Sequence, residues 1–266
     1  MNLLTTLRAG IAAGLTALAV LAAPAQAETL TVGAYPANPP WEYKTEKGDF
    51  EGFEVDMVTD IAKRLNRELK ISDMGFQALF AATASNRIDI AISTITITDE
   101  RLASQSFTQG YYDADLGLVT AESGGVTGLK DMKGKVVGTL ASSTGEAWIK
   151  AHMAEAGFSE VKTYPDQNSL LLDVLAGRVA GGINDELGFQ TQAKQMKGLK
   201  VVETIPTGDK YGLMMAKGSP LLGPVNDAIT AMKQDGTMAR IYEQWLGSAP
   251  KADSSTVTVL DLPAAK

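Results

Sequence analysis

The sequence predicts an α/β protein built from two similar lobes, and two observations support this fold class. Short apolar strands alternate with amphipathic helices, a pattern typical of mostly parallel sheets that helices cover on both faces. Two segments also recur in the same order along the chain: residues 30–35 resemble residues 135–140, and residues 86–93 resemble residues 177–184. This order indicates two related lobes, with chance similarity between short apolar strands as the alternative.

The first lobe is expected to begin with a buried strand at residues 30–35. The proline-rich residues 36–40 end this strand, because proline supplies no donor to the ladder. Apolar residues at helical spacing predict a helix over residues 53–66 with one buried face. A second predicted helix over residues 77–85 leads into a strand at residues 88–92.

The chain is expected to leave the first lobe near residues 117–121 and to return near residues 211–216, where a further strand is predicted. The amphipathic region 224–246 would then cover the first lobe as helices, and the polar segment after it indicates a mobile tail. The expected boundaries are residues 28–116 with 213–248 for the first lobe, 117–212 for the second lobe with its hinges, and 249–266 for a flexible tail.

The N-terminal 27 residues have the three parts of a secretory signal. Arg8 provides the basic end, residues 9–21 the apolar run, and Ala25-Gln26-Ala27 the cleavage site. The chain has no cysteine, so neither a disulfide nor a lipid-modified cysteine holds or tethers it. We expect cleavage after Ala27 and a bacterial periplasmic location, with release into the medium as the alternative.

The composition excludes several classes of function. Twenty-four basic residues against 31 acidic ones give a net charge of −7, which repels phosphate backbones and anionic lipids, so we expect neither nucleic acid nor a membrane surface as a partner. The single histidine, His152, lies in a predicted helix and is expected at its surface. Without a cysteine, a Gly-x-Ser-x-Gly sequence or a Walker A sequence, we predict no catalytic residue, no cofactor and no metal site.

The candidate ligand site lies at the carboxyl ends of the predicted strands, because ligands of open parallel sheets bind there. These ends are residues 35–38, 93–98, 141–145 and 184–185. They are rich in hydroxyl, amide and charged groups, which predicts a polar ligand.

Two oppositely charged residues stand near these ends. Arg101 suits a carboxylate because its planar guanidinium donates two parallel hydrogen bonds, and Thr94 and Thr96 can add donors from the strand end. Asp185 directly follows a predicted strand and can meet a cation. The alternatives are a surface salt bridge for Arg101 and a helix cap for Asp185.

Other polar and aromatic residues near the strand ends have two interpretations each. The small residues 142–145 can cradle an anion, although they lack a P-loop lysine and a plain turn is the alternative. Tyr35 and Phe76 can form pocket walls, whereas packing within the lobe is favoured for Trp41 and Tyr43. Thr98, which two acidic residues follow, is expected to cap a helix.

Eight short motifs occur in a characteristic order across almost all of the mature sequence. They are GFEVD at 52–56, TITITDER at 94–101, FTQGYY at 107–112, STG at 143–145, GRV at 177–179, ND at 184–185, DGT at 235–237 and IYEQW at 241–245. With these motifs the chain resembles the periplasmic amino-acid-binding proteins of ABC importers, family 3 of the bacterial extracellular solute-binding proteins. The resemblance implies two α/β lobes, joined by two crossovers, that close over one amino acid.

The resemblance also implies roles for individual residues. The ligand's α-carboxylate would be bound by Arg101, with help from Thr96 and from the main chain near Thr94, Thr144 and Gly145. Asp185 would receive the α-ammonium group.

The chain departs from the family pattern where relatives determine specificity. Tyr35 stands where many relatives have an aspartate, and Asn38 stands where they have an aromatic residue, while Phe76 matches an aromatic wall. An acidic residue at the first position often serves cationic side chains in relatives. Its loss argues against a lysine- or arginine-type ligand and favours an uncharged polar or aromatic amino acid, or a derivative.

The expected function is therefore capture of an amino acid or related zwitterion and its delivery to a membrane-embedded ABC permease by a monomeric protein. The alternative is an exported dehydratase on the same fold that acts on a prephenate-like acid, although the sequence offers no evident general acid in the cleft. A sensor domain fused to signalling machinery is a third hypothesis, which the lack of a transmembrane or helix-turn-helix segment disfavours.

Overall fold

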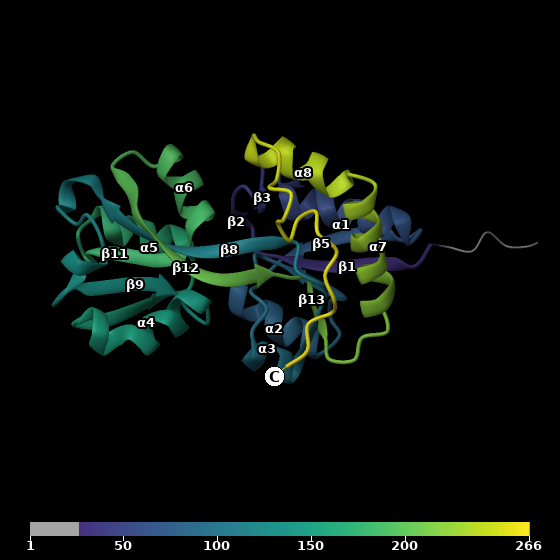
Figure 1. Cartoon of the computed structure of the whole chain (residues 1–266), viewed down its shortest axis with the longest axis horizontal. Coiled ribbons are helices and arrows are strands. Elements are labelled where there is room, and N and C mark those ends of the chain that lie inside the picture. The colour runs from purple at the N-terminus through teal and green to yellow at the C-terminus, as the bar shows by residue number, and fades with distance from the viewer. Residues whose placement is uncertain (1–26, 266) are drawn as a thin grey trace, which may run out of the picture.

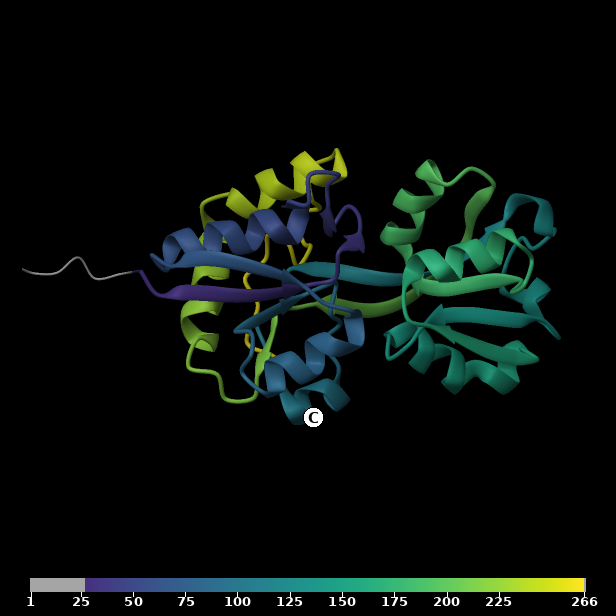
Figure 2. The same ribbon diagram turned by 180° about the vertical axis from the view of Figure 1, so that it is seen from behind.

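The computed structural model describes residues 27–265, so the predicted signal sequence, apart from Ala27, lies outside the described residues. Two lobes lie side by side, each with a five-stranded sheet that carries helices on both faces (Figures 1 and 2). In the described part of the chain, no helix is both long and apolar enough to cross a membrane.

The first lobe contains both ends of the described chain. Its sheet strands are β1 (Thr29–Ala34), β5 (Glu68–Asp73), β6 (Ile90–Ile92), β7 (Gln105–Phe107) and β13 (Met214–Ala216). Its helices are α1 (Phe53–Arg64), α2 (Phe76–Ala84), α3 (Asp99–Ser104), α7 (Leu222–Gln234) and α8 (Thr237–Leu246). A separate small sheet is formed by β2 (Ala37–Asn38), β3 (Glu42–Lys44) and β4 (Phe50–Glu51).

The second lobe is formed by the middle of the chain. Its sheet strands are β8 (Tyr112–Ala121), β9 (Val136–Leu140), β10 (Glu160–Tyr164), β11 (Gly181–Asp185) and β12 (Leu199–Tyr211). Its helices are α4 (Thr144–Ala156), α5 (Gln167–Leu175) and α6 (Glu186–Gln195), with the 3-10 turns η1 (Glu122–Gly124) and η2 (Leu129–Met132).

The two sheets have equivalent topologies. Their strand orders are β5-β1-β6-β13-β7 and β10-β9-β11-β8-β12, and in each sheet only the fourth strand runs against the other four. Strand β1 thus corresponds to β9, and β6 corresponds to β11. These are the pairs that the recurring segments predicted, so the interpretation of two related lobes is confirmed.

Two long strands connect the lobes. Strands β8 and β12 pair with each other over most of their length, with register shifts near Val201 and Ile205, and both run from the second sheet to the first lobe (Figure 1). Apolar clusters cover both faces of each sheet: α1, α7 and α8 pack on one face of the first sheet and α2 on the other. The connecting strands are therefore attached to two separately packed cores.

Predicted and observed elements differ in two places, where a predicted strand and a predicted helical region are interrupted. The strand predicted over residues 211–216 is interrupted, because β12 ends at Tyr211 and β13 begins at Met214. At the intervening Gly212, a Cβ atom would lie 2.9 Å from the side chain of Ile97 and 3.1 Å from the carbonyl oxygen of Thr108. The predicted helical region 224–246 is divided by Gly236, whose φ of 80° favours glycine and cannot continue a helix.

The C-terminal segment, predicted to be a flexible tail, has contacts with the first lobe. It runs along the first lobe (yellow in Figure 1). Ser255 hydrogen-bonds through its main-chain nitrogen to Asp113 at 2.9 Å, and the Thr256 hydroxyl donates to the carbonyl oxygen of Tyr111 at 3.0 Å. Lys233 of α7 donates to the carbonyl oxygen of Thr258 at 2.9 Å. Hydrogen bonds rather than apolar side chains hold this segment, and composition does not reveal them.

Candidate functional site

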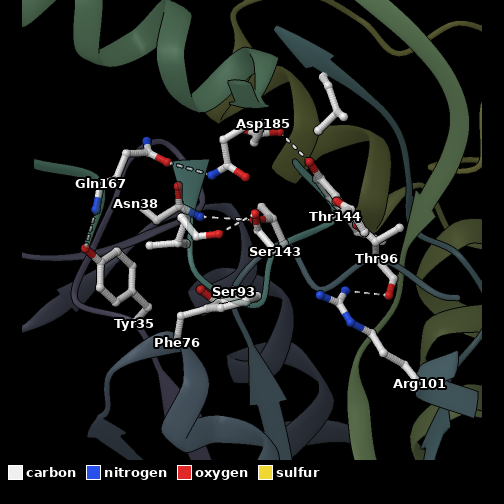
Figure 3. A pocket seen from close by; sticks show the side chains of 15 residues that line it. Tyr35, Asn38, Phe76, Ser93, Thr96, Arg101, Ser143, Thr144, Gln167 and Asp185 are labelled. Carbon is white, nitrogen blue, oxygen red and sulfur yellow. Dashed lines mark hydrogen bonds between the residues drawn. The ribbon is translucent and has the colours of Figure 1, made fainter. Parts of the chain in front are cut away.

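A small cavity of about 30 Å³ lies between the two lobes, where the carboxyl ends of strands from both sheets meet. This volume has room for no more than a few water molecules, so the two lobes lie close against each other. Eight of the nine predicted site residues line it: Tyr35, Asn38, Phe76, Thr94, Thr96, Arg101, Thr144 and Asp185. Residues of the first lobe form one wall and residues of the second lobe the other (Figure 3).

Arg101 lies in the first turn of α3, which the Thr98 side chain caps as predicted. Its guanidinium donates to the carbonyl oxygen of Thr96 at 2.9 Å and, across the cleft, to that of Ser142 at 3.1 Å. No carboxylate of the described chain forms a salt bridge with it, so the predicted alternative of a surface ion pair is not observed. Burial lowers the pKa of Arg101 to about 10, so the guanidinium is still a cation at neutral pH.

Asp185 ends β11 and is buried at 6 % exposure. Its carboxylate accepts hydrogen bonds from the Trp41 indole at 3.2 Å, from the Tyr211 hydroxyl and from the Gly188 main-chain nitrogen. The last bond makes Asp185 the N-cap of α6, so the helix-cap alternative also holds. Burial raises the pKa of Asp185, because removal from water disfavours the charged form.

The N-terminus of α4 presents further donors to the cavity. Ser143 caps this helix by accepting from the Glu146 main-chain nitrogen. Thr144 and Gly145 are the first two residues of α4, so their main-chain N–H groups have no carbonyl partner within the helix and suit an anion. Gly145, which does not line the cavity itself, packs so tightly that a Cβ atom would lie 2.5 Å from the carbonyl oxygen of Ile183.

Thr94 offers its hydroxyl to the cavity, and not its main-chain N–H as expected. Its main-chain N–H is directed to the Glu54 carboxylate, with distances of 3.1 and 3.2 Å to the two oxygens, and is thus not free for a ligand carboxylate. This direction follows from its φ of 48°, an uncommon conformation for a threonine. The Thr94 hydroxyl faces the cavity and accepts from the Asn38 amide at 3.3 Å.

The lobes are closed upon each other around the cavity. The hydroxyls of Thr96 and Thr144 lie 3.3 Å apart, and the Gln77 amide donates to the Ser142 hydroxyl at 3.1 Å. On the opposite side, the Gln167 main-chain nitrogen donates to the Tyr35 hydroxyl at 3.3 Å. The charged groups of both lobes therefore face one enclosed space.

The sequence interpretation missed several lining residues: Ser93, Leu116, Leu140, Ser143, Gln167, Asn184 and Tyr211. Ser143 lies in the predicted anion cradle 142–145, and Ser93 and Asn184 lie at predicted strand ends, but none of the three was named as a ligand-binding residue. Gln167 follows Tyr164, the carboxyl end of β10, and this strand was not predicted. Residues 160–164 contain a valine and precede a turn at 165–166. This pattern could have predicted the strand and would have added a fifth strand end to the site.

Residues given a packing role lie mostly as predicted. Trp41 is fully buried against the rings of Tyr112 and Tyr211, although its indole also reaches Asp185 across the cleft. Tyr43 packs on Trp245 away from the cavity. His152 lies on α4, half-buried and stacked on Trp148, outside the cavity. Among the described residues, no cluster of histidine, aspartate and glutamate could hold a metal ion.

A hinged pair of α/β lobes that closes over one cation and one carboxylate defines a solute-binding protein. The chain matches the family of bacterial extracellular solute-binding proteins, family 3, over residues 30–248. It belongs to this family.

Named relatives have the same architecture. The L-arginine-binding protein of Pseudomonas aeruginosa is 33 % identical over 244 residues, which cover 87 % of this chain and 94 % of the relative. An ancestral arginine-binding protein bound to arginine is 34 % identical with a TM-score of 0.77, covering 82 % of this chain and 98 % of that structure. An ancestral amino acid-binding protein, described as a precursor of cyclohexadienyl dehydratase, is 25 % identical with a TM-score of 0.73, covering 82 % and 94 %.

Proposed function

We propose that this protein captures one amino acid, or a related zwitterion, between its lobes and delivers it to an ABC importer. The observation that carries this proposal is a cavity between the lobes that one cation and one buried carboxylate line: Arg101, which forms no salt bridge with a described carboxylate, and Asp185. The relatives named for arginine binding support the same ligand class.

Each pole of the ligand has its own set of partners. Arg101 binds the α-carboxylate, together with the Thr96 hydroxyl and the main-chain N–H groups of Thr144 and Gly145 at the start of α4. Asp185 accepts hydrogen bonds from the α-ammonium group, whose positive charge balances the negative charge of the carboxylate.

Closure follows from the division of these partners between the lobes. Burying a zwitterion is costly unless both charges are paired, so an open lobe that offers only one pole binds weakly. Arg101 belongs to the first lobe and Asp185 to the second, and both poles are paired only when the cleft is shut. The ligand therefore shifts the equilibrium towards the closed form, whose shape a transporter can recognise.

The cellular setting is part of the same proposal. A signal sequence cleaved after Ala27 would direct the mature chain to the periplasm, where it acts as a monomer on a membrane-embedded permease. Its lobes comprise residues 28–116 with 213–248 and residues 117–212, so that closure turns about β8 and β12.

An exported dehydratase is the second candidate, which the likeness to the dehydratase precursor favours. Such an enzyme needs a general acid within reach of its substrate. Among the described lining residues the only carboxylate is Asp185, which three donors already hold, and there is no histidine. We therefore infer binding without turnover.

A thermal-shift screen of refolded, ligand-stripped mature protein tests the proposal. A ligand that binds only the native state stabilises it by about 2.7 kcal/mol at a hundredfold excess over Kd. We expect a clear shift from at least one amino acid or opine and no turnover of prephenate. No shift with any zwitterion, or formation of a dehydrated product, would overturn the proposal.

A further inference from the structure

The side-chain end of the cavity carries no charge of its own. Figure 3 shows Arg101 at one end of the site and Tyr35 with Gln167 at the other. The charged lining residues, Arg101 and Asp185, are both engaged by the α-groups of an amino acid under the proposed function. No lining residue is then left to neutralise a charged ligand side chain, and an unpaired charge in such an enclosed site is costly.

The remaining wall is instead a cluster of amides. The Asn184 amide nitrogen donates to the Gln167 side-chain oxygen at 3.0 Å, and the Gln167 amide nitrogen donates to Gln192 at 3.1 Å. The Asn38 amide nitrogen donates to Thr94. Within the described chain, the amide oxygens of Asn38 and Asn184 accept no hydrogen bond and both residues line the cavity.

The Tyr35 hydroxyl completes this arrangement. It accepts from the Gln167 main-chain nitrogen, which leaves its own proton for another acceptor. The wall thus offers two acceptors and one donor, a set that complements a group with N–H donors and one carbonyl oxygen.

Two acidic residues stand behind this wall. Glu42 and Glu54 are fully buried and lie outside the cavity lining, with Glu42 bound to the Ser93 hydroxyl at 2.8 Å. Burial, with Glu54 as the second cause, raises the pKa of Glu42 well above its usual range, which favours its uncharged form. The Glu54 carboxylate is bound by the Thr94 N–H and the Tyr111 hydroxyl.

We propose that the site selects amino acids whose side chain ends in an uncharged carboxamide-type group, glutamine or asparagine before arginine, glutamate or an apolar residue. This proposal rests on the proposed function for the two α-poles. A charged side chain would find no counter-charge, and an apolar one would leave the oxygens of Asn38 and Asn184 unpaired in a closed site.

Calorimetry with ligands of similar length tests the proposal on ligand-stripped mature protein. We expect glutamine or asparagine to bind at least tenfold more tightly than glutamate, arginine and methionine. Tightest binding of any of the last three would overturn the selectivity while leaving capture of amino acids intact. Failure of all five to bind would overturn the selectivity, and the screen above then decides whether the proposed function fails with it.

Two variants separate a direct role of the amide wall from a general loss of fold. Asn184→Ala is expected to weaken the preferred carboxamide ligand about tenfold and methionine less than threefold; equal losses would contradict contact with the side chain. Glu42→Gln removes the ionisable group behind the wall with little change of shape. If this group carries no charge that the ligand senses, the affinity should change less than threefold. A tenfold loss of affinity without a change in melting temperature would show that Glu42 carries a charge that acts on the ligand. This result would overturn the proposal of an uncharged wall.

Discussion

The two lobes have the same strand order but hold their charged residues in different ways. Asp185 ends β11 and is held by three donors, one of which makes it the cap of α6. Arg101 follows the equivalent strand β6 and is bound by two main-chain carbonyl oxygens, one from each lobe. Each residue thus has one hydrogen bond to the other lobe, Asp185 with Trp41 and Arg101 with Ser142, but only Asp185 also caps a helix of its own lobe.

Replacement of Arg101 by alanine should have the largest effect on binding. Loss of one partner of an enclosed charge pair costs about 2 to 5 kcal/mol, so the affinity should fall by roughly one and a half to three and a half orders of magnitude. The melting temperature of the ligand-free protein should change little. Calorimetry checks the affinity, and Arg67→Ala, whose guanidinium pairs with Glu28 outside the cavity, is the matched control.

Asp185→Asn should reduce affinity about a hundredfold, because an amide can retain hydrogen bonds but cannot neutralise an ammonium group. The native protein should also lose affinity in acid. Burial raises the pKa of Asp185, so the ionised form that pairs with the ligand is complete above this pKa and disappears as the pH falls through it. Titrations between pH 4 and 8 should show a decline in the native protein and a flat profile in the variant; identical profiles would exclude Asp185 as the ammonium site.

Trp41→Phe should have a smaller effect, about tenfold. The substitution keeps an aromatic ring but removes the indole donor that crosses the cleft to Asp185, and a hydrogen bond to a charged group contributes about 1.5 kcal/mol or more. Tyr43→Phe, two residues further along the chain and packed on Trp245, is the control and should bind like the native protein. Equal affinities of the two variants would show that the Trp41 indole does not contribute to closure of the cleft.

Deletion of residues 249–266 should have the smallest effect on binding, less than threefold. It removes the hydrogen bonds of Ser255, Thr256 and Thr258 to the first lobe, which should cost about 2 kcal/mol of folding free energy and lower Tm by about 5 °C. Scanning calorimetry measures the shift. An unchanged Tm would mean that the segment does not hold the first lobe.

The residues that sequence reasoning could find are those that follow apolar strands. Arg101, Asp185 and the threonines stand at strand ends, where the topology of parallel sheets gathers polar groups. Gln167 was missed because β10 alternates charged and apolar residues weakly and was not predicted. Glu42 and Glu54 could not be recognised as buried, because acidic residues beside a turn usually remain in water. Their burial depends on Ser93, Thr94 and Tyr111, which only the folded chain brings to them.

The direction of the Thr94 N–H was likewise beyond the sequence. Alternation of isoleucine and threonine predicts a strand, and an extended strand would turn this N–H to its neighbour. The strand β6 ends at Ile92, and the positive φ of Thr94 turns the N–H to Glu54 instead. Because Thr94 has a left-handed conformation, its main-chain N–H points to Glu54 and not to the ligand site.

The central claim is that two poles on two lobes must both be paired. Its most direct test is calorimetry of the best-binding amino acid against its α-carboxamide and its N-acetyl derivative, each of which lacks one charge. Loss of at least a hundredfold in affinity with both derivatives is the predicted result. Binding of either derivative as tightly as the parent amino acid would contradict the two-pole site.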